Sequence, residues 1–234
     1  MTRRACPVVL FLALGLLAGC APATYLTHPQ FEERARLIKT VALMPPDMKV
    51  YRLTAGGVTE LMDEWSEQGR RNAGSALQNL LAEQGGYSFR EFSPGDDPKL
   101  QDEYEDARTL FQAVVNSLFF RLAIPGKRGQ SGFSLGPLPA LASATGADAL
   151  LFVHGVDYIS TGGRVALMTI GAMFGVAIPG GHTRLVAGLV DVRTGDVIWL
   201  NSTGSGTGDL RNPSSTTSLV STLLSGFKPV GSKP

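Results

Sequence analysis

The 234-residue chain is almost neutral, with 21 Lys and Arg against 20 Asp and Glu, so it lacks the basic excess that indicates a nucleic-acid partner. Both cysteines, Cys6 and Cys20, lie within the first twenty residues, which excludes disulfides and cysteine-ligated metal sites from the remainder. About 215 residues remain from Cys20 onward, enough for one domain with a hydrophobic core.

The first twenty residues have the pattern of an export signal. Arg3 and Arg4 precede an apolar run from Val8 to Leu17, which is too short for a membrane helix of about 20 residues. The run closes with Leu17, Ala18, Gly19 and Cys20, and this ending resembles the bacterial lipobox. The resemblance implies a signal peptide of residues 1–19, cleavage before Cys20 and acylation of that cysteine. An ordinary secretory signal, cut at another bond, is the alternative.

The residues after Cys20 predict how the protein is held. Ala21 and Pro22 differ from the aspartate that often retains lipoproteins in the inner membrane, so the resemblance implies an outer-membrane protein that faces the periplasm. Residues 20–36 show no sustained periodicity, which predicts a lipidated cysteine and a tether. Membrane lipid, bound through the acylated cysteine, is therefore the first expected partner.

Hydrophobic periodicity predicts the elements of the first half. They are a buried strand at 37–44, a helix at 58–81 that ends at Gly85 and Gly86, a strand at 87–92, and a helix at 98–119. Asp97 and Pro98 suit the cap and first turn of that second helix. Acidic residues on both helices are typical of solvated faces and helix N-termini, so they predict no metal site. Residues 124–139 are predicted to form a loop.

The second half completes a mixed fold. We expect a short helix at 138–144, strands at 149–156, 185–192 and 197–200, and a last helix from Asn212 to Phe227. Gly195 in Thr194-Gly195-Asp196 predicts a hairpin turn, because glycine tolerates positive φ. The order β-α-β-α-α-β-β-β-α indicates an α/β (α+β) fold, a mixed sheet with helices packed on it. Residues 37–227 form one predicted periplasmic domain, and 228–234 a tail.

Three short motifs of the second half resemble a known group of envelope proteins. They are Gly146-Ala147-Asp148 at a strand start, Gly155 inside that strand, and the hairpin from Asp191 to Trp199. In these motifs the chain is similar to the periplasmic domain shared by the curli secretion channel family, the penicillin-binding-protein activator lipoproteins and the amino-terminal domain of the Tol-system propeller protein. The resemblance implies binding and assembly, with an envelope protein or a second copy as partner, and no catalytic residue, cofactor or metal.

Motifs of hydrolytic enzymes are missing from the sequence. It contains neither the His-Glu-x-x-His zinc motif nor the Gly-x-Ser-x-Gly elbow. His154 lies among apolar residues of a predicted strand, which favours a structural role. An envelope hydrolase stays as a third hypothesis and would need a pocket that joins His154 with Asp148 or Asp157. On a strand, His154 and Asp148 share a face while Asp157 points away.

The connection at 161–183 is far longer than a hairpin turn requires. It carries no charge from Val165 to Gly180, and a helix over those residues would rise about 24 Å, less than the roughly 30 Å of a hydrocarbon core. Its candidate partner or membrane contacts are Val165, Leu167, Met168, Ile170, Met173, Phe174, Val176 and Ile178.

Three alternatives remain for this insertion: burial against the domain's own sheet, contact with another subunit or partner, and insertion into lipid. Gly171 and Gly175 have the spacing that lets two helices approach closely. In the curli channel family the corresponding insertion crosses the membrane, but residues 165–178 are apolar in both phases of an alternating strand, which argues against a pore. The leading hypothesis is a lipid-anchored accessory or scaffold protein of envelope assembly, and an oligomeric secretion channel is the alternative.

Overall fold

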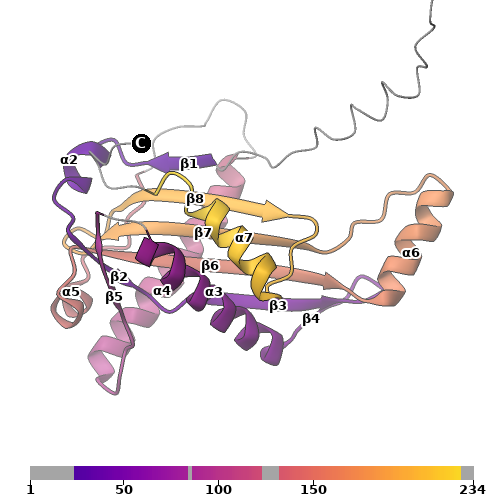
Figure 1. Ribbon diagram of the computed structural model, residues 1–234, viewed down its shortest axis with the longest axis horizontal. Coiled ribbons are helices and arrows are strands. Elements are labelled where there is room, and N and C mark those ends of the chain that lie inside the picture. Colours follow the sequence, from indigo (N-terminus) through magenta and orange to yellow (C-terminus); the bar gives the residue numbers. More distant parts are fainter. Residues whose placement is uncertain (1–23, 84–85, 123–131, 228–234) are drawn as a thin grey trace, which may run out of the picture.

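A mixed sheet of eight strands forms the centre of the computed structural model, which describes residues 24–83, 86–122 and 132–227 (Figure 1). The strands are β1 (Thr24–Thr27), β2 (Thr40–Leu43), β3 (Asp47–Leu53), β4 (Thr59–Leu61), β5 (Ser88–Glu91), β6 (Ala149–Ser160), β7 (His182–Asp191) and β8 (Val197–Ser205). Their order is β1-β8-β7-β6-β2-β5, and β3 follows β2 along the same side of β6. β2 and β3 run parallel to β6, whereas β7 runs antiparallel to it.

Helices cover both faces of this sheet. They are α2 (Phe31–Ala35), α3 (Asp63–Glu83), α4 (Pro98–Leu122), α5 (Pro139–Thr145), α6 (Gly162–Met173) and α7 (Pro213–Leu223). In Figure 1, α3 and α7 lie on the near face and α4 lies behind the sheet. α6 stands beyond the strand ends, where β6 finishes and β7 begins, and is separated from the other helices (Figure 1).

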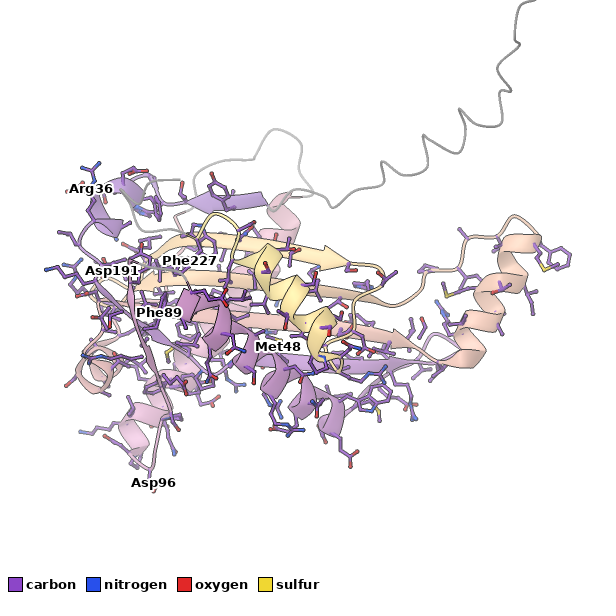
Figure 2. The ribbon with its side chains drawn as sticks, in the orientation of Figure 1. Arg36, Met48, Phe89, Asp96, Asp191 and Phe227 are labelled. Atoms are coloured by element: carbon purple, nitrogen blue, oxygen red, sulfur yellow. The ribbon has the colours of Figure 1, made fainter. Side chains whose placement is uncertain are left out.

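Two apolar layers result, one on each face. Leu151 and Val153 of β6 pack in the layer of α3 and α7, while Leu150 and Phe152 pack in the layer of α4 and α5. Side chains alternate across a strand, so a strand covered on both faces needs a continuous apolar run. Each large apolar side chain that is fully buried stabilises the fold by about 1.5–3 kcal/mol. Phe89 and Phe227 lie together at the edge of the first layer (Figure 2).

The predicted fold class, a mixed sheet with helices packed on it, is confirmed. The predicted elements occur in the expected order, with β1, α2, β3, β4 and α6 in addition. Asp97 accepts a hydrogen bond from the backbone N–H of Lys99 at the start of α4, as its capping position predicts. Gly195 has a φ of +72° in the turn between β7 and β8, in agreement with the predicted hairpin.

The prediction of an irregular tether over residues 20–36 is wrong from Thr24 onward. β1 pairs with the edge strand β8, and α2 follows it. Leu26 is buried in the α4 layer, whereas the neighbouring Tyr25 is exposed. The alternation of exposed and buried side chains in β1 is too short to indicate a strand in the sequence. The strand forms because its backbone pairs with the free edge of β8.

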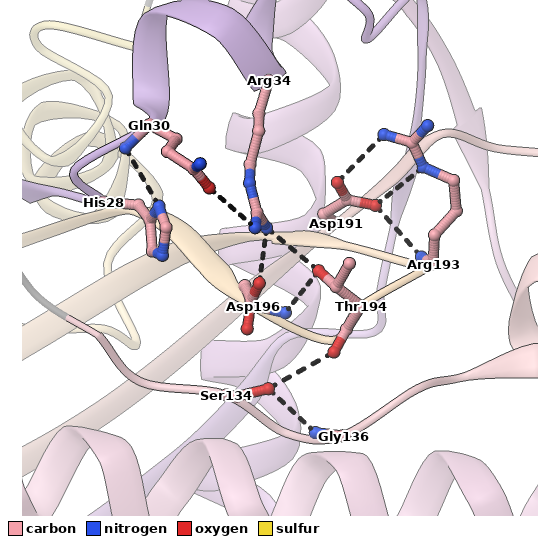
Figure 3. A network of polar contacts seen from close by, with 9 residues as sticks. All are labelled: His28, Gln30, Arg34, Ser134, Gly136, Asp191, Arg193, Thr194 and Asp196. Carbon is pink, nitrogen blue, oxygen red and sulfur yellow. Dashed lines mark hydrogen bonds and ion pairs between the residues drawn. The ribbon is translucent and has the colours of Figure 1, made fainter.

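A polar network fastens α2 to the turn between β7 and β8 (Figure 3). Nη1 of Arg34 donates to Oδ2 of Asp196 at 2.5 Å and to Oγ1 of Thr194 at 3.1 Å. Asp191 accepts hydrogen bonds from the backbone and the guanidinium of Arg193. Asp191, Arg193, Thr194 and Asp196 belong to the hairpin motif on which the family resemblance rests. In this chain they stabilise the turn and its contact with α2.

Residues 58–62 do not belong to the helix that the sequence predicts at 58–81. Thr59–Leu61 form β4, which pairs with β3, and α3 begins only at Asp63. The apolar side chains of Val58 and Leu61 supported the predicted helical pattern, yet they are 59 % and 51 % exposed. Pairing with β3 satisfies the backbone of this segment, so apolar spacing alone misplaced the start of the helix.

Candidate functional site

Two features lie at the end of the sheet where β6 finishes and β7 begins. The first is a cavity of about 280 Å³ between α4 and the strands β6 and β7, which we call the sheet cavity. The second is α6 with the segment after it. The sheet cavity is lined by Val115 and Asn116 of α4, His154, Val156 and Tyr158 of β6, and His182, Arg184 and Val186 of β7.

His154 is held in the sheet cavity by a carboxylate from the neighbouring strand. Asp47 starts β3 directly after Pro45 and Pro46 and is the cross-strand partner of His154. Nδ1 of His154 lies 2.7 Å from Oδ2 of Asp47, and Nε2 of Gln112 donates to the same oxygen at 2.6 Å. Burial alone would raise the pKa of Asp47, but the hydrogen bonds from His154 and Gln112 and the charge of His154 hold that pKa below its ordinary value.

The two carboxylates of which the hydrolase hypothesis required one beside His154 both have other partners. Oδ2 of Asp148 accepts hydrogen bonds from the backbone N–H groups of Lys39 and Thr40. Asp157 points to the opposite face, as the alternation of the strand predicts, and accepts from Thr183 Oγ1 and Leu210 N. These contacts contradict the pocket that the hydrolase hypothesis required, in which His154 would meet Asp148 or Asp157. No sequence signal linked His154 to Asp47, which lies 107 residues earlier in the chain.

Aromatic rings continue from the sheet cavity along the same face. Tyr51, Tyr158 and His182 are cross-strand partners on β3, β6 and β7. The Tyr51 and Tyr158 rings stack with centroids 5.1 Å apart, and the Tyr158 and His182 rings lie 4.9 Å apart. Such pairs stabilise a sheet by about 0.2–1 kcal/mol each. They also place the Tyr158 side chain between its two neighbours, at the wall of the sheet cavity.

α6 begins with a well-formed cap. Oγ1 of Thr161 accepts a hydrogen bond from Arg164 N, and the Arg164 guanidinium donates to the carbonyl oxygen of Pro179. The two ends of the connection are thus joined at its base. Beyond this base the segment 165–178, which we call the apolar tip, extends away from the domain with its side chains standing free of the other elements (Figure 2).

Most predicted contact residues of the insertion are exposed in the apolar tip. The exposed fractions are 50 % for Val165, 40 % for Leu167, 53 % for Ile170, 79 % for Met173, 79 % for Phe174 and 55 % for Val176, while Met168 and Ile178 are half-buried. Burial against the sheet, one of the three alternatives from the sequence, is therefore wrong. α3, α7, α4 and α5 pack on the two faces of the sheet, and α6 lies beyond the strand ends rather than on either face.

Gly171 is the one buried residue of α6. The chain folds back on it: the N–H of Val176 donates to the carbonyl oxygen of Gly171, and a Cβ at Gly171 would lie 2.8 Å from Cδ1 of Ile178. Gly175 follows the end of the helix with a φ of +73°. The two glycines thus shape the turn after α6. The face of the helix at Gly171 is covered by Val176 and Ile178 of the same chain.

The predicted lipidation site Cys20 and the lipobox residues Leu17, Ala18 and Gly19 lie outside the described residues, as does the tail at 228–234. Within the part of the chain that the structure describes, no helix combines the length and apolar character needed to cross a membrane. The same part holds no cluster of three or more His, Cys, Asp or Glu side chains that could bind a metal ion.

Comparison with known proteins identifies no family. No family model matches the chain, and no curated protein matches it. Two solved structures of PelC dodecamers from Paraburkholderia phytofirmans are weakly similar. The first, a PelC variant, has a TM-score of 0.40 and 15 % identity and covers 89 % of this chain and 99 % of its own. The second has a TM-score of 0.38 and 15 % identity and covers 91 % and 98 %.

Proposed function

We propose that this chain is a lipid-anchored accessory or scaffold protein of the bacterial outer membrane, which faces the periplasm and acts by binding another envelope protein. The observation that carries the proposal is the sheet cavity, an open hollow lined by Tyr158, His182 and Arg184 above apolar side chains. Tyrosine and arginine are enriched at the centres of protein interfaces. The lipobox ending at Cys20 supports the membrane location.

The lining of the sheet cavity defines the partner's chemistry. Val115, Val156 and Val186 give the cavity an apolar lining, and His182 adds a polar imidazole ring to it. Asp47 is compensated by His154 and Gln112, so its negative charge is not directed at a ligand. A partner segment with one apolar side chain next to a hydrogen-bonding group is complementary to this arrangement.

Crosslinking in intact cells tests the partner surface. A photoreactive phenylalanine analogue at Tyr158 is expected to capture one envelope protein upon irradiation. The matched control carries the analogue at Leu37, which is 57 % exposed and lies just before β2, near the other end of the sheet. Equal capture from both positions, or no capture from Tyr158, would contradict the proposed surface.

Acylation of Cys20 is tested separately. The Cys20→Ala chain is expected to lose incorporation of labelled fatty acid, because the acyl chains are attached through the cysteine sulfur and the new N-terminus. A Cys6→Ala chain is the matched control, since Cys6 lies within the proposed signal peptide. Labelling that persists in the Cys20→Ala chain would disprove the lipid anchor.

We assign no catalytic role to the Asp47 and His154 pair. Oδ2 of Asp47 already bonds His154 and Gln112, and Oδ1 faces Nη1 of Arg108 at 3.8 Å. Among the residues that the structure describes, those that line the sheet cavity include no Ser, Thr or Cys side chain that His154 could activate as a nucleophile. The pair instead joins β3, β6 and α4, and its effect is on stability.

A further inference from the structure

We propose that the apolar tip inserts into the surface of the same phospholipid bilayer to which Cys20 is attached, and so forms a second membrane contact. This inference rests on the lipid anchor of the proposed function and adds the orientation of the domain. The occupant of the apolar tip is lipid, and the partner protein binds elsewhere, at the sheet cavity.

The chemistry of the apolar tip changes from its base to its end in the way that an interfacial segment requires. Arg164 and His182 flank the base, and no charged residue lies between them. The exposed fraction is 40–53 % at Val165, Leu167 and Ile170 and reaches its maximum of 79 % at Met173 and Phe174. Interfacial elements bury their apolar side chains about 5–10 Å into the headgroup and acyl boundary while polar groups stay in water. α6 rises about 18 Å, which is ample for that depth.

The position of β1 brings this bilayer within reach. Thr24 pairs with Ser202, which pairs with Val186, four residues from the start of β7 at His182. Four strand residues span about 13 Å, so β1 begins close to the end of the sheet that bears α6. Cys20 precedes Thr24 by four residues, and four residues reach at most about 14 Å. Acyl chains on Cys20 would therefore be attached close to the end of the sheet that bears α6.

The pairing of β1 is essential to this geometry. A tether that ran freely from Cys20 to Arg36 would reach at most about 55 Å and would leave the domain free to turn. The ladder between β1 and β8, and the bonds from Arg34 to Asp196 and Thr194, remove that freedom. The anchor thus limits which surface of the domain meets the bilayer.

A second copy of the chain fits the apolar tip less well than lipid does. Helix pairs that pack through Gly-x-x-x-Gly need both glycines on an open face of the helix. In this chain Ile178 and Val176 cover Gly171, and Gly175 lies in the turn after the helix. The exposed apolar side chains of α6, from Val165 to Met173, spread over an arc of roughly 200° of the helix, which is wider than a single helix–helix seam. Lipid can contact an arc of this width, whereas a single helix partner covers a narrower stripe.

Depth-dependent quenching tests the inference. Acylation of Cys20 and removal of Cys6 leave no other thiol, so Phe174→Cys provides one site for an environment-sensitive fluorophore. The purified lipoprotein is reconstituted into vesicles of phosphatidylethanolamine and phosphatidylglycerol. The matched control is Leu37→Cys, an exposed apolar position near the other end of the sheet. The unsubstituted protein should take up no label.

The fluorophore at position 174 is expected to shift its emission to shorter wavelength, and nitroxides on the acyl chains should quench it several-fold more strongly than the fluorophore at position 37. Water-like emission at position 174 would overturn the inference. Shielding from water without quenching by lipid nitroxides would also overturn it, because a second copy would then cover the tip. Loss of acylation, or of crosslinking from Tyr158, would contradict the proposed function and can be distinguished from both results.

Discussion

Arg34 and Asp196 form an ion pair of 2.5 Å between α2 and the turn that joins β7 to β8, with 19 % and 23 % of their side chains exposed. This pair is a main link of the N-terminal segment to the domain, together with the β1 ladder. Burial alone would raise the pKa of Asp196, but hydrogen bonds from Arg34, Thr194 and Ser134 outweigh it and lower that pKa.

Arg34→Ala is expected to loosen α2 more than it destabilises the whole domain. A partly exposed ion pair contributes about 0–1 kcal/mol, so the global free energy of unfolding should fall by no more than roughly 1 kcal/mol. Hydrogen exchange of the α2 amides should rise clearly. Because the pKa of Asp196 is lowered on folding, its contribution is present above the unfolded pKa and is lost as the pH falls through the folded pKa. Equal exchange rates in both chains would contradict the assigned link.

Asp157 predicts a pH dependence of the opposite sign. Burial raises its pKa, although hydrogen bonds from Leu210 and Thr183 oppose the rise. A carboxyl whose pKa is raised on folding contributes most below its unfolded pKa, and this contribution is lost as the pH rises through the folded pKa. Asp157→Asn should therefore flatten the fall in unfolding free energy over that interval, as measured by urea denaturation at a series of pH values. If the pH profile of Asp157→Asn equals that of the unsubstituted protein, Asp157 does not cause the fall in unfolding free energy.

Gly188 has no room for a methyl group. An added Cβ would lie 2.4 Å from Cε2 of Phe111, and the Phe111 ring is stacked on Phe152 with centroids 5.3 Å apart. The ring cannot move without disturbing the α4 layer, so Gly188→Ala should lower the unfolding free energy by about 1–3 kcal/mol. The matched control is Gly206→Ala, where no atom lies within 4 Å of an added Cβ and the effect should stay within about 0.5 kcal/mol. Equal denaturation midpoints for the two variants would refute the packing argument.

Phe174→Ser should leave the stability of the fold unchanged while it weakens the membrane contact. The side chain is 79 % exposed, so its removal takes little apolar surface out of the core, and the unfolding free energy should change by less than about 0.5 kcal/mol. Phe111→Ser, in the buried α4 layer, is the contrasting variant and should destabilise strongly. A large loss of stability in Phe174→Ser would mean that the apolar tip is buried in the folded protein.

Much of the fold was predictable because its main elements carry strong local patterns. The continuous apolar run of β6 and the helical spacing in α3, α4 and α7 specify element types without knowledge of their neighbours. β3 was missed because Asp47, Lys49 and Arg52 interrupt it with charges, and only its pairing with β6 reveals it as a strand. The site depended on the same pairing, which places Asp47 beside His154 and Tyr51 beside Tyr158.

The amino-acid sequence alone predicted the mixed fold and showed an uncharged apolar insertion and an ending at Cys20 that resembles a lipobox, because each is a local pattern of residue types. Only the tertiary structure decided that the insertion stands outside the core. An apolar segment is buried only where an apolar face of the domain remains uncovered. Its position therefore depends on which other elements already cover the sheet. Here α3, α7, α4 and α5 cover it, and α6 stays exposed outside the core.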